Sequence, residues 1–146
     1  MRIQRRIADT KAYGDKRATD DIKYIVIQTI ENKPVSHYNI VKGEVFQLIP
    51  DDYMSDSVNG RRLCSKGILH GICTKYNSIS IGLPQKASAE DLNSCIKLIM
   101  TIKQRYKIED SNVIRQMDVT GEPSPLIWYD DVKWAKFIQR LKDLYK

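Results

Sequence analysis

The feature that most constrains the fold is a short run of β-branched residues near the start of the chain. The run is Ile22-Lys23-Tyr24-Ile25-Val26-Ile27, and it ends at Gln28-Thr29. Such a run is typical of a strand that is buried on both faces. With 146 residues, the chain is long enough for one domain with a single core. The run therefore predicts a strand at the centre of a sheet.

Other segments also have the composition of strands. They are residues 37–41, 44–49, 79–83 and 113–115. Lys42-Gly43, between the first two, predicts a tight hairpin turn. Residues 53–78 form a long loop rich in Ser, Asn and Gly, and long ordered loops in compact domains are usually functional or mobile.

Two segments have the periodicity of helices. The first begins at Ser88, a capping residue, followed by Glu90 and Asp91 in the first turn, where the helix dipole favours acids. Its apolar residues continue to Tyr106. The second begins near Asp130 and carries one apolar face, which favours packing against a core.

Strands with intervening and terminal helices predict an α/β fold, a single domain with a central mixed β-sheet flanked by helices. Residues 22–146 are expected to form the core, and residues 1–21 an arm on the domain surface. Residues 116–127, which contain Gly and Pro, are expected to form a loop.

The formal net charge is +6, but the basic residues are scattered, and no nucleic-acid-binding motif is present. Nucleic acid is therefore not expected as a partner. The three cysteines, Cys64, Cys73 and Cys95, have no spacing that predicts a disulfide framework. Cys64, His70 and Cys73 lie close together but match no standard zinc motif.

No apolar run is long enough to span a membrane. The N-terminus carries charges with no apolar segment behind them, so it does not have the pattern of a signal peptide. The expected location is the cytoplasm, unless a membrane pore releases the protein.

Five stretches, in order, resemble one family. They are Tyr24-Ile25-Val26-Ile27-Gln28-Thr29, Ser36-His37-Tyr38-Asn39-Ile40-Val41, Phe46-Gln47-Leu48-Ile49-Pro50, Asn77-Ser78-Ile79-Ser80-Ile81-Gly82 and the stretch from Val113 to Gly121. They cover most of residues 22–138. The chain resembles the zinc-dependent N-acetylmuramoyl-L-alanine amidases of phage endolysins and peptidoglycan recognition proteins, and among them the clostridial endolysins most closely.

The resemblance implies a zinc site, but the ligand positions have changed. A catalytic zinc needs about three protein ligands and one open position for water. Where the family has its two zinc-binding histidines, this chain has Gln28 and Gln116; where it has the third ligand, this chain has Ser124. Neutral carboxamides are poor zinc ligands. No metal and no cofactor are therefore expected.

The positions that assist catalysis in the family differ as well. Ser36 stands where a catalytic Tyr is common, Pro84 where a Glu is common, and Glu122 where many members carry a Lys that supports the oxyanion. The segment between Gln28 and His37 is too short for the helix that usually forms one wall of the family's groove.

Some polar residues remain as candidates for ligand binding. His37, Asn77 and Asp118 are the predicted contacts, although a packed, hydrogen-bonded core residue is the other interpretation of His37. Ser124 with Asp118 lacks a nearby histidine base, so a nucleophile is not expected there. Asp51-Asp52 is interpreted as a turn.

The resulting hypothesis is a degenerate, zinc-free amidase domain, catalytically inactive, that binds peptidoglycan or a protein partner. The resemblance also suggests a lysis or export context with release through a holin-like pore. Two alternatives stay open: an active peptidoglycan hydrolase with a non-standard site, and an interaction module for an anionic polymer.

Overall fold

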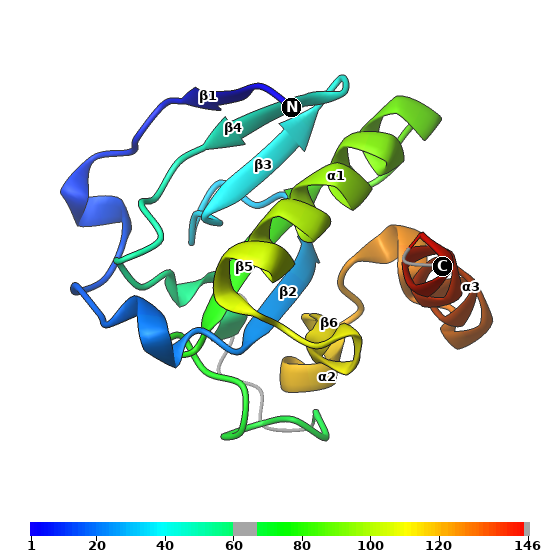
Figure 1. The fold of residues 1–146 in the computed structure, drawn as a ribbon. Helices are drawn as coiled ribbons and strands as arrows, with labels where there is room; N and C mark the ends of the chain where they lie inside the picture. The colour runs from blue at the N-terminus through cyan, green and yellow to red at the C-terminus, as the bar shows by residue number, and fades with distance from the viewer. Residues whose placement is uncertain (60–66, 145–146) are drawn as a thin grey trace.

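Six strands form one sheet in the order β1-β4-β3-β5-β2-β6 (Figure 1). The computed structural model describes residues 1–59 and 67–144. The strands are β1 (Ile3–Arg5), β2 (Tyr24–Thr29), β3 (Tyr38–Val41), β4 (Glu44–Gln47), β5 (Ser78–Leu83) and β6 (Val113–Arg115). Only β3 and β4 pair antiparallel, and the other neighbours are parallel. The predicted mixed sheet is confirmed.

Within the described residues, three α-helices accompany the sheet. They are α1 (Ala89–Tyr106), α2 (Met117–Thr120) and α3 (Asp131–Asp143). Short 3₁₀ turns lie at Thr10–Ala12, Thr19–Asp21, Asp56–Asn59, Asp110–Asn112 and Leu126–Trp128. No helix in the described ranges has both the length and the apolar character needed to cross a membrane.

The β-branched run forms β2, which lies between β5 and β6. Its register with β5 runs from Tyr24 opposite Ser78 to Thr29 opposite Leu83. The hairpin between β3 and β4 turns at Lys42 and Gly43, whose φ angles are 52° and 76°. Positive φ at both central positions gives the tight turn that matches the twist of the strands, so the predicted hairpin is confirmed.

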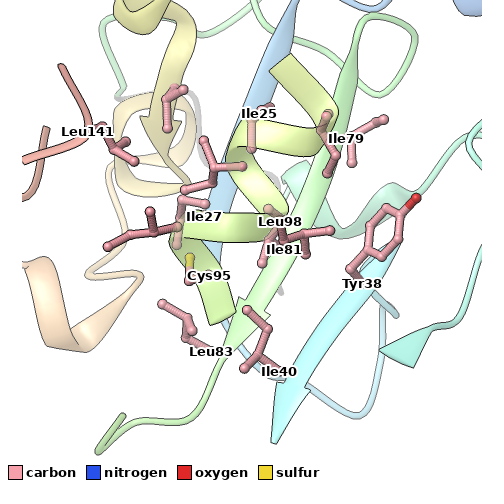
Figure 2. Packing of buried hydrophobic residues seen from close by; sticks show 14 of the residues in the cluster. Ile25, Ile27, Tyr38, Ile40, Ile79, Ile81, Leu83, Cys95, Leu98 and Leu141 are labelled. Atoms are coloured by element: carbon pink, nitrogen blue, oxygen red, sulfur yellow. The ribbon is translucent and has the colours of Figure 1, made fainter. Parts of the chain in front are cut away.

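Helix α1 begins as its sequence predicts. The Ser88 side chain accepts a hydrogen bond from the Asp91 amide, and the Asp91 side chain accepts one from the Ser88 amide, which completes a capping box. Figure 2 shows α1 lying across β2 and β5, with Ile27, Ile81 and Leu98 among the buried side chains of this core. Burial of these aliphatic side chains is the main force that holds the helix to the sheet.

Helix α3 closes the side of this core. Phe137 stacks on Trp128 with ring centroids 3.9 Å apart, and Leu141 is buried beside them. The segment 116–127, expected to be a loop, instead contains the short helix α2. Its turn is held by Asp118, whose carboxylate accepts hydrogen bonds from the Arg115 amide at 2.9 Å and from the Arg115 guanidinium at 3.2 Å.

The N-terminal arm takes part in the sheet. Residues 3–5 pair in parallel with β4 and form its edge strand, which the polar composition of residues 1–21 did not indicate. Further along, Arg17 is buried and donates hydrogen bonds to the carbonyl oxygens of Asp51, Lys75 and Ser78 at 3.0, 2.8 and 2.5 Å. The arm is therefore tied to two loops of the core.

Candidate functional site

The two faces of the sheet have different chemistry because side chains alternate along each strand. Ile25 and Ile27 of β2 point to α1, whereas Val26 belongs to a smaller cluster with Val58 and Ile114 on the other side. The face opposite α1, here called the polar face, carries His37, Asn39, Gln28, Ser78, Ser80, Gly82 and Gln116. The site described below lies on this face.

A cavity of about 190 Å³ opens where β2 and β6 end. It is here called the carboxamide pocket. Its lining residues are Gln28, Thr29, Glu31, Pro34, Ser57, Gln85, Gln116, Glu122, Pro123, Ser124 and Leu126. The structure therefore brings together Gln28, Gln116, Ser124 and Glu122, four positions that the sequence singled out from distant segments.

The two glutamines of the pocket have different surroundings. Gln116 donates a hydrogen bond from its Nε2 to the carbonyl oxygen of Ser57. Gln28 is fully buried, and neither its Nε2 nor its Oε1 has a hydrogen-bond partner among the described residues. An unsatisfied buried amide atom costs on the order of 1–3 kcal/mol, so the Gln28 side chain needs a partner that the described residues do not supply.

The segment from Ser124 to Leu126 is held beside the end of β2 by two hydrogen bonds to Thr29. The Thr29 amide donates to Ser124 Oγ at 3.1 Å, and the Leu126 amide donates to Thr29 Oγ1 at 3.0 Å. Because Ser124 Oγ accepts from a backbone amide, its own hydroxyl hydrogen is available to an acceptor in the pocket.

The fold around this pocket matches known solved structures. The chain is similar to the PlyG catalytic domain, with a TM-score of 0.74 and 19% identity over 98% of this chain and 94% of that one. It is similar to the XlyA catalytic domain (TM-score 0.72, 18% identity, 97% and 99% covered). It is also similar to the N-acetylmuramoyl-L-alanine amidase LysC from Clostridium intestinale URNW (TM-score 0.67, 13% identity, 97% and 98% covered).

This chain has the endolysin amidase fold. The fold expected from the five sequence stretches is thereby confirmed. No protein-family model matches the sequence, and no curated protein sequence matches it either. At identities below 20%, the similarity establishes the fold and leaves the chemistry of the site to the residues themselves.

Those residues do not fit the zinc ion that the amidase fold implies. At the three positions where the resemblance places zinc ligands, the pocket has two neutral carboxamides, Gln28 and Gln116, and the hydroxyl of Ser124. Across residues 1–59 and 67–144, no three His, Cys, Asp or Glu side chains lie together as a metal-binding group. Of Cys64, His70 and Cys73, which lie close together in the sequence, Cys64 is outside the described residues, and burial raises the pKa of Cys73 to about 12.

The other two substituted positions, Ser36 and Pro84, do not line the pocket. Ser36 is buried beside Gly82, and its Oγ has no partner within the described part of the chain. A Cβ added at Gly82 would lie 3.1 Å from Ser36 Oγ and 2.4 Å from Asn39 Oδ1, so two polar side chains crowd the space that this glycine leaves. Pro84 follows β5 and does not line the pocket, whereas the next residue, Gln85, does.

His37 lies in the interior and away from the pocket lining. Its Nδ1 accepts a hydrogen bond from the Ser80 amide at 3.1 Å, so its Nε2 carries the proton and donates to the Tyr53 carbonyl oxygen at 2.8 Å. Burial, and then the nearby Arg17 charge, lowers the pKa of His37 to about 4. The structure therefore places His37 as a neutral, hydrogen-bonded core residue.

Asn77 and Asp118, the other two predicted ligand contacts, do not line the pocket either. Asn77 lies before β5, at the opposite end of that strand, where its Oδ1 accepts from the Thr74 amide at 2.8 Å and its Nδ2 donates to the Ile72 carbonyl at 2.9 Å. Asp118 is occupied by Arg115. A role in ligand binding stays a prediction for all three.

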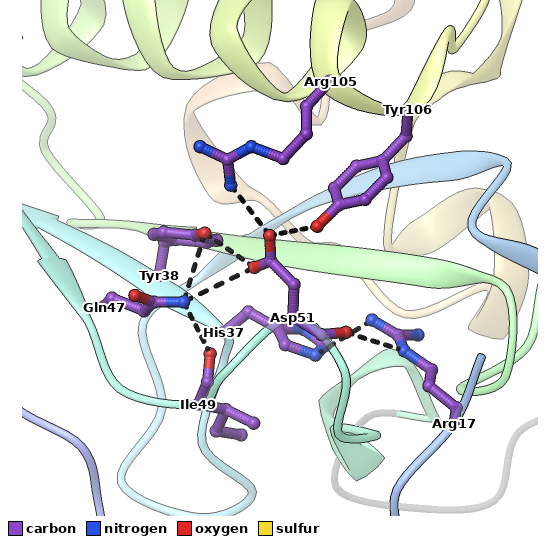
Figure 3. A network of polar contacts seen from close by, with 8 residues as sticks. All are labelled: Arg17, His37, Tyr38, Gln47, Ile49, Asp51, Arg105 and Tyr106. Carbon is purple, nitrogen blue, oxygen red and sulfur yellow. Dashed lines mark hydrogen bonds and ion pairs between the residues drawn. The ribbon is translucent and has the colours of Figure 1, made fainter. Parts of the chain in front are cut away.

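A second polar network surrounds Asp51 (Figure 3). Its carboxylate accepts hydrogen bonds from Tyr38 at 2.6 Å, from Arg105 at 2.9 Å and from Tyr106. Burial, with the neighbouring carboxylate, raises the pKa of Tyr106 to about 12. The turn expected at Asp51-Asp52 is thus also the anchor that joins the hairpin to the end of α1.

Several residues of the site were not singled out from the sequence. Ser57 supplies the carbonyl that holds Gln116, and Gly82 leaves room for Asn39 and Ser36. One signal was available: Ser78-Ile79-Ser80-Ile81-Gly82-Leu83 alternates strictly between small or polar residues and large aliphatic ones. Such alternation predicts one apolar and one polar face for β5.

Proposed function

We propose that this chain is an amidase-fold domain that binds peptidoglycan without cleaving it and holds no zinc. The observation that carries the proposal is the carboxamide pocket, which lies at the ends of β2 and β6 with Gln28, Gln116 and Ser124 on its walls. These side chains are uncharged, and a zinc ion needs charged or imidazole ligands.

The pocket also lacks other means of hydrolysing an amide. Cleavage requires an activated water and a group that stabilises the oxyanion. The titratable residues in the described lining are Glu31 and Glu122. A carboxylate can accept a proton, but its negative charge opposes a developing oxyanion, so neither residue supplies the second requirement.

Support for peptidoglycan as the ligand comes from the fold. LysC, which shares this fold over nearly the full length of both chains, is named for the N-acetylmuramoyl-L-alanine bond. A cavity is retained at the pocket although the ligand types on its walls do not suit zinc. The net charge of +6 also favours association with the anionic polymers of a cell wall.

Three measurements on the purified chain test the proposal: zinc content by elemental analysis, cosedimentation with purified peptidoglycan sacculi, and release of peptide from those sacculi. We expect less than about a tenth of an equivalent of zinc, saturable cosedimentation and no released peptide. Stoichiometric zinc together with peptide release would establish the active-hydrolase alternative instead. Triple substitution Gln28→His, Gln116→His and Ser124→Cys provides a matched chain with the family's ligand types.

The salt dependence of binding separates this proposal from a simple anionic-polymer module. Attraction to a polyanion falls steeply as salt rises, whereas hydrogen bonds within a pocket are less sensitive. Cosedimentation that persists at 0.5 M NaCl favours the pocket. Release through a holin-like pore stays a prediction, checked by fractionating cells with and without such a pore.

A further inference from the structure

Buried hydroxyl groups connect His37 to the carboxamide pocket. The His37 amide donates to Ser80 Oγ at 3.0 Å, and the Ser80 amide donates to His37 Nδ1 at 3.1 Å. Ser57 Oγ donates to Ser80 Oγ at 2.9 Å, and the Ser57 carbonyl oxygen accepts a hydrogen bond from Gln116 Nε2. His37, Ser80, Ser57 and Gln116, here called the serine relay, therefore form a continuous chain of contacts. It ends at the pocket, which Ser57 and Gln116 line.

All four residues of the serine relay are buried, and Ser57 and Ser80 are only 0% and 2% exposed. At such positions bulk solvent replaces a lost partner only if the structure opens, so each group depends on its neighbour. Ser57 is also held from a further side, because its amide donates to Ser55 Oγ at 3.2 Å. These bonds together set the position of the Ser57 carbonyl oxygen that Gln116 contacts.

The His37 ring is a fixed end for the serine relay. Its Nδ1 accepts from the Ser80 amide, and its Nε2 donates to the Tyr53 carbonyl oxygen at 2.8 Å. The charged groups that act on it are Arg17 of the arm, whose Nη2 lies 3.2 Å from Nε2, and Asp51 of the turn (Figure 3). A proton on Nδ1 would face the Ser80 amide hydrogen and add a charge beside Arg17, so the neutral tautomer is favoured.

At the other end, the serine relay orients the carboxamide of Gln116. Its Nε2 is turned to the Ser57 carbonyl oxygen, which leaves Oε1 as the acceptor that Gln116 offers to the pocket. A flipped amide would place Oε1 against that carbonyl, and two acceptors repel each other. The polar character of this wall therefore depends on where the Ser57 carbonyl is held.

We propose that His37 is a positioning residue for the carboxamide pocket, and that it acts through Ser80 and Ser57 on the orientation of Gln116. His37 touches no atom of the lining itself. The proposal concerns the geometry of the pocket, and it holds whether or not peptidoglycan is the ligand.

The test uses the full ¹⁵N-labelled chain, and NMR reads the serine relay from both ends. Ser57→Ala removes the hydroxyl that binds Ser80 and keeps the carbonyl that Gln116 contacts. We expect the order parameter of the Gln116 side-chain NH₂ group to fall from about 0.8 in the wild type to below about 0.6 in Ser57→Ala and in Ser80→Ala. The NH₂ signals are assigned with Gln116→Met.

Ser78→Ala is the matched control. Ser78 lies on the same strand, is 2% exposed, and donates its hydroxyl hydrogen to the Thr74 carbonyl at 2.7 Å. Its truncation removes a buried hydrogen bond of the same kind outside the serine relay, so the Gln116 order parameter should stay at the wild-type value.

The reverse measurement uses the His37 ring nitrogens, which are simple to assign because His70 is the other histidine of the chain. Coupling between two sites is reciprocal. Gln116→Met is therefore expected to shift the His37 ring signals, whereas Gln104→Met on the exposed surface of α1 leaves them unchanged.

A pH titration from 7 to 4 separates positioning from a purely structural role. Protonation of His37, whose pKa burial lowers to about 4, removes the acceptor of the Ser80 amide. In the wild type, part of the shift of the Gln116 NH₂ signals should follow the titration of the His37 ring. That part should be absent in Ser57→Ala, whereas shifts caused by Glu31 and Glu122 of the lining appear in both chains.

Three results would overturn the proposal: a Gln116 side chain as rigid in Ser57→Ala as in the wild type, equal loosening by Ser78→Ala, or His37 ring signals unaffected by Gln116→Met. The last measurement needs no substitution at a serine, so it decides the matter even if Ser57→Ala and Ser80→Ala do not fold. Sacculi that fail to cosediment contradict the proposed function alone, because none of these readouts uses a ligand.

Discussion

The two faces of the sheet are held together by different kinds of interaction. On the α1 face, Ile25, Ile27 and Ile81 pack against a helix in a continuous aliphatic core. On the polar face, Ser80 and His37 are joined by directed hydrogen bonds, whereas the side chain of Gln28 has no partner within the described residues. The stability of the α1 face depends on how much apolar area is buried and how well it packs. The stability of the polar face depends on each hydrogen-bonding group having its partner.

This difference separates the part of the molecule that holds the fold together from the part that forms the pocket. Apolar burial is non-directional, so the α1 face keeps the sheet and helix together irrespective of what happens on the other side. Gln28 and Gln116, at the ends of β2 and β6, are not members of that core. Substitutions at Gln28 and Gln116 are therefore expected to change the chemistry of the pocket more than the packing of this core.

The largest expected effect comes from the α1 face. Ile99 is fully buried in its centre, and Ile99→Ala is expected to lower the free energy of unfolding by about 3–4 kcal/mol, through lost transfer energy and the cavity left behind. Urea unfolding followed by circular dichroism measures it. Val132→Ala is the control, because Val132 is 63% exposed and its truncation should cost less than about 0.5 kcal/mol. A loss below 1 kcal/mol at Ile99 would contradict the role given to this core.

The next effect is a change of stability with pH, caused by His37 on the polar face. The pKa of His37 is about 4 in the folded chain, below its ordinary 6.5. As pH falls from 6.5 to 4, the unfolded chain binds a proton that the folded chain excludes, so stability is lost across this window. The expected loss is about 3 kcal/mol. Unfolding experiments across that range, with His37→Gln as reference, measure it; an equal pH slope in both chains would show that His37 is not the cause.

A smaller effect tests the crowding around Gly82. A Cβ there would lie 2.4 Å from Asn39 Oδ1 and 2.9 Å from Ile30 Cγ1, so Gly82→Ala is expected to destabilise by about 2 kcal/mol. Asn39→Ala removes the nearer of these two atoms. In a double-mutant cycle, the Gly82→Ala cost should fall by roughly half when Asn39→Ala is already present. Strictly additive costs would indicate that the strand itself shifts instead.

The smallest expected effect is a change in stability that has opposite signs at Gln28 and Gln116. Gln28→Met removes two unpaired buried polar atoms and is expected to stabilise the chain by up to about 1 kcal/mol. Gln116→Met removes the hydrogen bond that Gln116 donates to the Ser57 carbonyl oxygen, so it is expected to destabilise by about 1–2 kcal/mol. Thermal unfolding of both variants decides the point. Loss of stability in both would mean that Gln28 is satisfied in the unliganded chain.

Much of the fold could be predicted because its elements have strong local signals. The β-branched run predicts β2, Lys42-Gly43 predicts the hairpin, and Ser88 predicts the start of α1. The edge strand β1 has no such signal. It contains Ile3, Gln4 and Arg5 and forms because the edge of β4 offers unpaired backbone groups, which any sequence without proline can use.

The site was predicted less completely. The positions of Gln28, Gln116, Ser124 and Glu122 follow from the resemblance, and they meet at one pocket. The hydrogen bonds of His37 could not be derived in the same way. They depend on the register of β3 with β5 and on a loop carbonyl at Tyr53, which are contacts between segments distant in sequence.

The buried guanidinium of Arg17 has a consequence for how the molecule opens. It donates hydrogen bonds to the carbonyl oxygens of Asp51, Lys75 and Ser78, which lie 34 to 61 positions further along the chain. The first of these belongs to a turn, and the other two lie just before β5 and at its first residue. Fluctuations that release the arm must therefore release these loops too. In amide hydrogen exchange, the arm and both loops should behave as one cooperative unit, faster than β2 but with a shared rate.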